Sequence, residues 1–229
     1  MREAGAEVDV VNLREKKIKN CVGCFTCWTK TPGHCIHKDD MTRELFPKWL
    51  EADLVVYATP LYNYAMTASL KAFIERTLPS LEPFFEIHEG RMCHPLRNRS
   101  PAVVILSVSG MPDEAHFGPL SAHMKYSFAT RGRKLAAEIY RPAAELLTNP
   151  LFKKKAGDVL EAIAEAGKEL AHSMAVSPGT MARITQPLVD SRLFAEMGNL
   201  FWKTCIAEKV TPKEFEKAFE KCDIIAMPT

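Results

Sequence analysis

The apolar positions of the chain fall into two kinds of run, and the two kinds alternate. Three short runs are almost continuously apolar and rich in Val, Ile and Ala, as in strands buried on both faces of a parallel sheet. Between them, apolar residues recur every three or four positions, which predicts amphipathic helices. The β-α-β-α-β order predicts an α/β fold with a doubly wound parallel sheet. The predicted strands are residues 53–58, 101–108 and 134–140, and the predicted helices are residues 67–76 and 119–129.

The segment before the first of these strands carries weaker signals. Residues 7–13 form a short β-rich run, and Gly5 before them is suited to end a helical turn at the start of the chain. Residues 41–52 have helical periodicity, and Pro47 is expected to kink that helix or to start a second one. Residues 78–100 are interrupted by proline and glycine, which predicts an irregular excursion and a candidate oligomer contact.

Beyond Arg141 the pattern contains helices alone. An Asn-Pro pair at residues 149–150 is suited to begin a helix with one apolar stripe, which a Pro-Gly pair at residues 178–179 interrupts. Another apolar segment covers residues 184–206, and a capping box at residues 211–214 begins a last helix. This part of the chain is expected to pack on the sheet domain, with a dimerisation or lid role as the alternative.

Composition adds limits to this picture. With 47% hydrophobic residues and a formal net charge of +2, the chain can bury a substantial core, and the charge predicts no nucleic-acid partner. No apolar run approaches the roughly 20 residues of a membrane span, and the first residues lack the apolar run of a signal peptide. We therefore expect no membrane association and a cytoplasmic location. The predicted division is an α/β domain over residues 1–141 and a helical extension over residues 142–229.

Four of the seven cysteines lie within fifteen residues, in the pattern C-x2-C-x2-C-x7-C. Thiols this close together can converge on one soft metal centre. Three cysteines at two-residue gaps can hold three corners of a cubane cluster, and a fourth, more distant thiolate can complete it. The candidate ligands are Cys21, Cys24, Cys27 and Cys35.

Zinc and free thiols are the alternatives at this motif. A zinc site usually takes one C-x2-C pair and a second pair well downstream, whereas here the third cysteine follows closely. The spacing therefore favours a cluster over zinc, and zinc over free thiols. His34 and His37 flank Cys35 and could substitute as ligands, although histidines in loops are more often solvated.

The order of these motifs resembles a known family. The cysteine motif, Asp39-Asp40-Met41, and the segments LVVYATPLYNY and ASLKAFIERT are similar to the flavodoxin-like NADPH-dependent FMN reductase family, and specifically to its iron-sulfur flavoprotein branch. The resemblance covers residues 7–140. It implies FMN, and a four-iron four-sulfur cluster held by the four clustered cysteines. The cysteines outside the motif are expected to be structural thiols, namely Cys93, Cys205 and Cys222.

A flavin is expected beyond the carboxyl ends of the strands, where open α/β sheets bind ligands. The loops there are residues 59–66, which resemble the family segment that lines the flavin, and residues 107–118. Backbone amides could bind the polar edge of the ring, and Tyr62 or Tyr64 could stack on its face. The alternative is that both tyrosines pack under the following helix. The candidate flavin residues are Thr59, Pro60, Leu61, Tyr62, Asn63, Tyr64, Ser107, Ser109 and Gly110.

The chain departs from the family pattern at its start. The family opens with a strand that runs into a Ser/Thr/Gly-rich loop at a helix N-terminus, which holds the FMN phosphate. No such element precedes residue 7, so we expect a flavodoxin-like sheet that lacks its first strand. Either the true start lies upstream, or the remaining strands pair directly and the phosphate site is lost.

Together these features predict an oxidoreductase that moves electrons between a reduced donor, ferredoxin or NAD(P)H, and an unidentified acceptor. The cofactors carry this chemistry, so we predict no catalytic acid or base. One alternative is an NAD(P)H-dependent FMN reductase whose cysteines hold zinc or nothing. Another is a non-catalytic metal-binding protein without flavin. By the resemblance, and because open sheet edges favour association, a homodimer or homotetramer is expected.

Overall fold

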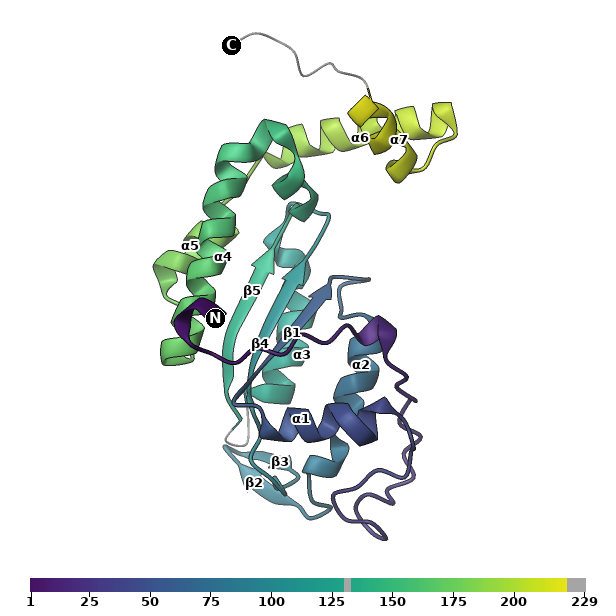
Figure 1. Ribbon diagram of the computed structural model, residues 1–229, viewed down its shortest axis with the longest axis vertical. Coiled ribbons are helices and arrows are strands. Elements are labelled where there is room, and N and C mark those ends of the chain that lie inside the picture. The colour runs from purple at the N-terminus through teal and green to yellow at the C-terminus, as the bar shows by residue number, and fades with distance from the viewer. Residues whose placement is uncertain (130–132, 222–229) are drawn as a thin grey trace. The chain divides into compact units, whose positions relative to one another are not determined.

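The computed structural model describes residues 1–129 and 133–221 (Figure 1). The chain divides into two compact units. The first unit covers residues 1–188 and contains the main sheet. The second unit covers residues 189–229 and is helical where it is described. None of the described helices is long and apolar enough to cross a membrane. The division at residue 141 into a flavin domain and an extension stays a prediction.

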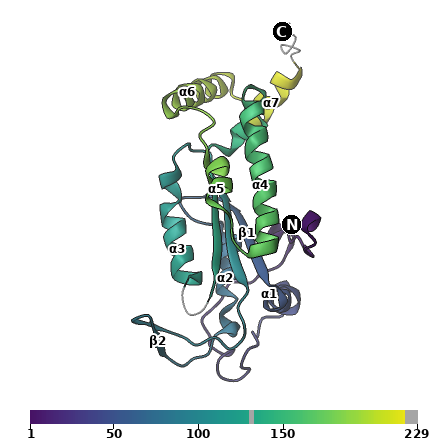
Figure 2. The ribbon, with the colours of Figure 1, turned by 90° about the vertical axis from the view of Figure 1, so that its left-hand side faces the viewer.

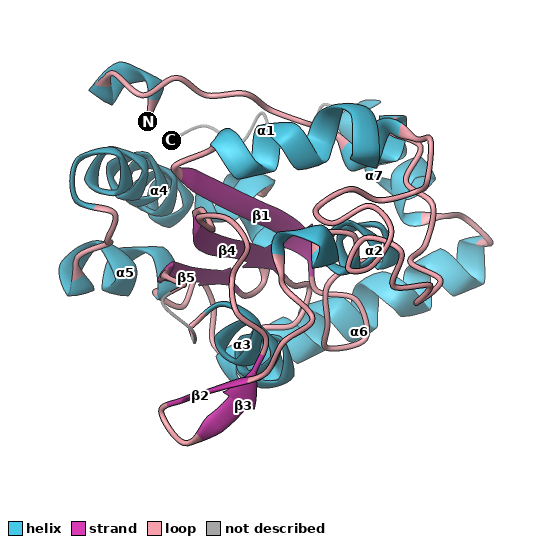
Figure 3. Ribbon diagram, turned by 90° about the horizontal axis from the view of Figure 1, so that it is seen from below, coloured by secondary structure: helices cyan, strands magenta, loops and turns pink. Residues whose placement is uncertain are grey.

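The main sheet contains the three predicted strands, each within two residues of its expected bounds. These are β1 (Leu54–Pro60), β4 (Ala102–Val108) and β5 (Leu135–Arg141), parallel and in the order β1-β4-β5 (Figure 3). The register pairs Thr59 with Ser107, so both strands end at the same level. The carboxyl ends therefore bring the two candidate flavin loops together.

Helices cover both faces of this sheet, as predicted (Figure 2). On one face α1 (Phe46–Glu51), α2 (Ala68–Glu75) and α3 (Gly118–Phe128) pack with strand residues into one hydrophobic core. Thr67 caps α2 by accepting a hydrogen bond from the Leu70 amide. The apolar side of α2 faces the core through Leu70 and Phe73. The central buried residues of this core are Trp49, Tyr57, Leu70, Phe73, Val103, Ile105, Leu120, Met124 and Phe128.

The other face is covered by α4 (Lys153–Ser173) and α5 (Pro178–Thr185). The stripe that α4 turns toward the strands is built largely of alanines, whose small side chains allow close packing on Val104 and Ile139. With helices on both faces of a parallel sheet, the structure confirms the predicted doubly wound α/β class. The buried residues of the α4 stripe are Ala156, Val159, Ala162, Ala166 and Leu170.

Residues 7–13 do not form the predicted strand. They run irregularly into a short 3-10 helix, and no backbone hydrogen bond joins them to a strand in the described part of the chain. Val10 is 76% exposed, whereas Val11 and Leu13 pack against the core. A β-rich sequence becomes a strand only where a neighbouring strand offers hydrogen bonds, and here none does.

Pro47 acts as predicted within residues 41–52. The segment begins as a π-helix, Met41–Leu45, and continues as α1, with Pro47 in the first turn of α1. Proline has no amide hydrogen to donate to the preceding turn, so the helix changes type at this point. The excursion at residues 78–100 contains a small antiparallel hairpin, β2 (Glu86–His88) with β3 (Arg91–Cys93).

Over its described residues, the second unit contains α6 (Ser191–Glu208) and α7 (Pro212–Lys221). Asp190 caps α6, and Thr211 forms the predicted capping box with Glu214, each accepting from the other's backbone amide. Phe201 meets Phe215 edge to face, which joins the two helices. The 3-10 helices of the described residues all lie in the first unit and are Arg2–Ala4, Leu13–Glu15, Leu78–Ser80, Glu114–Phe117, Ala144–Thr148 and Pro150–Phe152.

Candidate cysteine centre and flavin loops

The segment that carries the four cysteines is a turning loop without strand structure. Gly23, Phe25 and Gly33 have left-handed φ angles of 62°, 52° and 83°, and each reverses the direction of the backbone. The Gly33 amide donates to the Cys27 carbonyl at 3.0 Å, which closes the loop on itself. This folding returns Cys35 to the neighbourhood of the first three cysteines.

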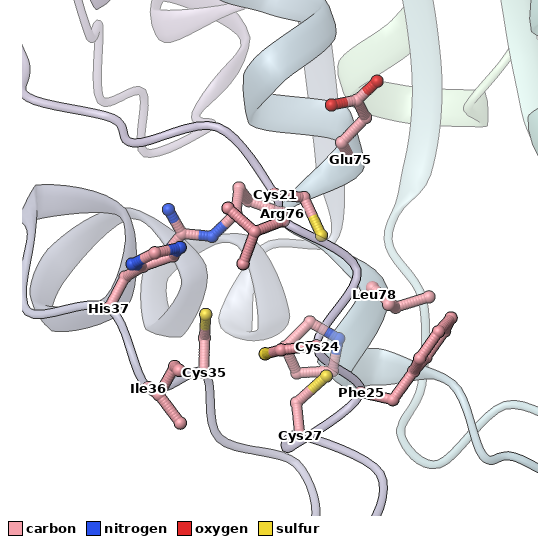
Figure 4. A pocket seen from close by; sticks show the side chains of 12 residues that line it. Cys21, Cys24, Phe25, Cys27, Cys35, Ile36, His37, Glu75, Arg76 and Leu78 are labelled. Atoms are coloured by element: carbon pink, nitrogen blue, oxygen red, sulfur yellow. The ribbon is translucent and has the colours of Figure 1, made fainter.

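The structure brings the four predicted cysteines together around one pocket. Figure 4 shows their side chains pointing into a common space from both arms of the loop. Cys27 is buried, Cys21 and Cys35 are half-buried, and Cys24 is exposed. Burial raises the pKa of the Cys27 thiol, and the proximity of Cys35, Cys21 and Cys24 raises that pKa further.

The lining of this pocket suits a soft, sulfur-bound group. Apart from the thiols, its wall is mostly apolar, with Val22, Phe25, Ile36, Leu78 and Pro79 among its residues. No three His, Cys, Asp or Glu side chains of the described residues are grouped so as to hold a single metal ion. Iron-sulfur clusters are held by cysteine thiolates, so four thiols around a largely apolar pocket are a donor set that fits such a cluster.

The two histidines beside Cys35 lie in different places. His37 lines the cysteine pocket, whereas His34 lines a second cavity of about 280 Å³. That cavity also contains Gly33, Met41, Phe46 and Glu51, and it shares Cys35, Arg76 and Pro79 with the cysteine pocket. These three shared residues lie between the two cavities.

A buried ion pair that the sequence did not indicate supports the cysteine pocket. Arg76 ends α2 and donates through Nη1 and Nη2 to the two carboxylate oxygens of Asp39, at 2.7 and 3.1 Å. Both side chains are 2% exposed or less. Burial alone would raise the pKa of Asp39, but hydrogen bonds from Arg76 and from the Lys19 and Thr42 amides hold it far below its ordinary value.

The first candidate flavin loop contains a tight turn at residues 62–65. Tyr62 and Ala65 exchange backbone hydrogen bonds of 2.9 and 3.0 Å. Asn63 and Tyr64, between them, both have left-handed φ angles, 50° and 63°. Asparagine tolerates this region, but tyrosine rarely adopts it, and such strain collects at functional sites.

Both tyrosines of this turn point into solvent, with 58% of Tyr62 and 51% of Tyr64 exposed. The expected alternative, in which they pack under the next helix, is therefore wrong. The ring of Tyr64 meets that of His116 edge to face, with centroids 5.7 Å apart. His116 is a contact that the sequence did not single out, and its Nδ1 is buried without a hydrogen-bond partner among the described residues.

The second candidate loop begins at the end of β4. The Leu61 amide donates to the Val108 carbonyl at 2.8 Å, which joins this loop to the first. The Ser109 hydroxyl donates to the Met111 carbonyl within the same loop, and Gly110 is exposed. Ser107 is fully buried, and its hydroxyl has no partner among the described residues. An unpaired buried hydroxyl at the carboxyl end of the strands suits a polar ligand there.

The structure thus groups the predicted residues into two candidate sites, one at each end of α2. Thr67 begins the helix beside the flavin loops, where its amide donates to Thr59 Oγ1 at 3.1 Å, and Arg76 ends it in the wall of the cysteine pocket. Nine residues at about 1.5 Å per residue put these two ends about 14 Å apart. Neither cavity described above reaches the flavin loops. The role of each flavin residue stays a prediction.

Comparison with known proteins gives three kinds of similarity. A family model described as NADPH-dependent FMN reductase matches residues 1–118, just over half of the chain. An iron-sulfur flavoprotein of Archaeoglobus fulgidus is 43% identical over 79 residues, 34% of each chain. An iron-sulfur flavoprotein of Methanocaldococcus jannaschii is 37% identical over 92 residues, 40% of this chain and 46% of the relative. The chain thus spans a third to a half of the length of these curated relatives.

Solved structures are similar at a lower level. An FMN-dependent NADH-azoreductase of Bacillus anthracis, in complex with FMN, is 15% identical, with a TM-score of 0.47. The match covers 71% of this chain and 80% of the azoreductase.

Proposed function

The chain belongs to the NADPH-dependent FMN reductase family, and on this basis we propose that it is a flavin-dependent oxidoreductase of the iron-sulfur flavoprotein type. It would bind FMN at the carboxyl ends of β1 and β4 and a four-iron four-sulfur cluster at the cysteine pocket. The observation that carries the proposal is the convergence of four cysteines on one largely apolar pocket in a chain of this family.

Cys21, Cys24, Cys27 and Cys35 would hold the cluster through their thiolates. A four-iron cluster supplies single-electron transfer when bound. The raised pKa of the Cys27 thiol opposes its ionisation in the metal-free protein, and a bound metal reverses that preference. The apolar wall would shield the thiolates of Cys21, Cys27 and Cys35 from water and oxygen, which attack exposed sulfur more readily, whereas Cys24 is exposed.

The loops at residues 59–66 and 107–110 would hold the flavin. When bound, FMN can accept a hydride and release the electrons one at a time. Backbone amides of the two loops would contact the polar edge of the ring, and the largely exposed rings of Tyr62 and Tyr64 would cover its face. The buried Ser107 hydroxyl would find in the ligand the hydrogen-bond partner that the described chain does not offer.

The family supports a nicotinamide nucleotide as electron donor, with ferredoxin as the alternative donor. The flavin loops and the cysteine pocket lie at opposite ends of one short helix, which suits transfer from a two-electron to a one-electron carrier. A homodimer or homotetramer remains our expectation for the assembly.

Cys24→Ser tests the assignment of the cysteines. We expect this variant, purified without oxygen, to lose nearly all bound iron and to keep its flavin, because the cysteines and the flavin loops are separate sites. Cys205→Ser is the matched control, since Cys205 is a buried thiol of α6 outside the motif, and this variant should keep both cofactors. Full iron occupancy in Cys24→Ser would refute the ligand assignment.

The same measurement separates the alternatives. Zinc in place of iron, with flavin present, would favour an FMN reductase without a cluster. Bound metal without flavin would favour a non-catalytic metal-binding protein.

A further inference from the structure

The Arg76 side chain has one donor that the structure leaves unused. The residue is 2% exposed, and its Nη1 and Nη2 atoms donate to Asp39, to the Lys19 carbonyl and to Thr42 Oγ1. Its Nε atom is buried and has no hydrogen-bond partner among the described residues. A buried donor without a partner is energetically unfavourable, so a partner is expected at this position.

The cysteine pocket is where that partner belongs. Arg76 and Cys35 both line the pocket, and Figure 4 shows the Cys35 side chain pointing toward the guanidinium group. A guanidinium cation attracts a thiolate, which is the form in which Cys35 would bind a metal. Burial tends to lower the pKa of Arg76, but its hydrogen bond with Asp39 and the proximity of Cys35 raise it.

Asp39 holds this geometry in place. Its two oxygens receive both Nη atoms of the planar guanidinium, and the Lys19 and Thr42 amides fix the carboxylate in turn. Because the guanidinium is a rigid fork, fixing its two Nη atoms also fixes the direction of Nε. Asp39 itself does not line the cysteine pocket, so the cationic partner of the pair is the one presented there.

We propose that Arg76 is a positioning residue of the cysteine centre, whose Nε–H donates to the Cys35 sulfur and whose charge stabilises the reduced state of that centre. This inference rests on the proposed function, because it assumes an iron-sulfur cluster on the four cysteines. Hydrogen bonds to ligand sulfurs are known to set cluster potentials, and a charged donor is stronger than a neutral one.

The effect on potential follows from the charge. Reduction adds one electron to the centre, and no bond of Arg76 forms or breaks. Arg76 stays protonated in both states, because guanidinium does not lose its proton in proteins. A cation that donates to sulfur therefore favours the more negative, reduced state, and its removal makes reduction harder.

The experiment is a redox titration of the iron-loaded full chain, followed by electron paramagnetic resonance. We expect Arg76→Gln to shift the midpoint potential of the cluster to more negative values. Arg76→Lys keeps the charge but has no Nε donor and no fork, so its shift should have the same sign and be smaller. Arg183→Gln is the control, because Arg183 pairs with Asp158 and does not line the cysteine pocket. The midpoint potential of the cluster in this variant should equal that of the wild type.

The outcomes separate this inference from the proposed function. An Arg76→Gln protein with full iron content and an unchanged potential would overturn the inference and leave the proposed function standing. A wild-type protein without iron would overturn the proposed function itself. Should Arg76→Gln fail to fold, Asp39→Asn/Arg76→Gln removes both buried charges, and the same negative shift is expected, since Arg76 is the partner that lines the pocket.

Discussion

At the scale of single residues, the strongest feature is the buried pair of Asp39 and Arg76. The pair joins the segment after the cysteine loop to the end of α2, two parts of the chain that are far apart in sequence. Each side chain would be an uncompensated buried charge without the other, and loss of one partner of such a pair costs about 3–5 kcal/mol. The pair therefore fixes the wall of the cysteine pocket.

This pair gives a pH dependence of known sign. The pKa of Asp39 is depressed in the folded protein, so its stabilisation is complete above the unfolded value of about 3.9 and is lost as the pH falls below it. At pH 7 we expect Asp39→Asn to lower the free energy of unfolding by about 3–5 kcal/mol. The difference from the wild type should narrow between about pH 4 and pH 2, as urea denaturation at several pH values would measure.

The control for this prediction is Asp158→Asn. Asp158 also pairs with an arginine, Arg183, but both side chains are 42% exposed, so its loss should cost about 1 kcal/mol or less. A difference between the wild type and Asp39→Asn that stays constant down to pH 2 would contradict the account of Asp39.

At the scale of elements, the backbone of the turn at residues 62–65 is strained at Tyr64, a residue type that is not required to form such a turn. A turn with two left-handed residues favours glycine at its second central position, and this chain has Tyr64 there. A side chain in the left-handed region costs about 1–2 kcal/mol. Under the proposed function, the exposed ring of Tyr64 would contact the flavin, which gives this strained residue a role.

Tyr64→Gly tests whether this residue lowers folding stability and strengthens FMN binding. Relief of the strain should raise the free energy of unfolding of the flavin-free protein by about 1 kcal/mol, while FMN binding becomes weaker. Tyr62→Gly is the comparison, because Tyr62 has no left-handed φ and glycine there should destabilise by about 0.5–1 kcal/mol. Equal destabilisation in both variants, measured by chemical denaturation, would refute the strain argument.

Helix α4 gives a second prediction at this scale. Ala162 is fully buried against the sheet, and the helix lies close because the side chain is small. Ala162→Leu should therefore lower the free energy of unfolding by about 1–3 kcal/mol. Ala164→Leu, on the exposed side of the same helix, should stay within about 0.5 kcal/mol of the wild type, and a comparable loss there would contradict the packing of α4.

At the scale of the whole molecule, the sequence predicted those features that depend on neighbouring residues in the chain, namely buried strands and helix caps. The strands β1, β4 and β5 are apolar because both faces are covered, and Thr67 and Thr211 cap their helices through neighbouring amides. The strand expected at residues 7–13 failed because a strand depends on a neighbour, which its own sequence does not reveal.

The features of the candidate site likewise fall into those that the local sequence predicted and those that it did not. The cysteine spacing predicted a common centre, and the four cysteines line one pocket of the structure, while their role as ligands stays a prediction. The pair of Asp39 and Arg76 could not be predicted, because its members are 37 residues apart and nothing local marks them as buried. The turn at Tyr64 was missed because tyrosine gives no signal for a left-handed residue. Cys93 and Cys205 are buried, as expected of structural thiols, and Cys222 lies outside the described residues.

The measurement that tests the central claim most directly is an ultraviolet-visible spectrum of the protein purified without oxygen, with iron, zinc and flavin quantified on the same sample. The account predicts flavin bands with a broad iron-sulfur shoulder, about four irons per chain and no stoichiometric zinc. A colourless protein with neither iron nor flavin would contradict it.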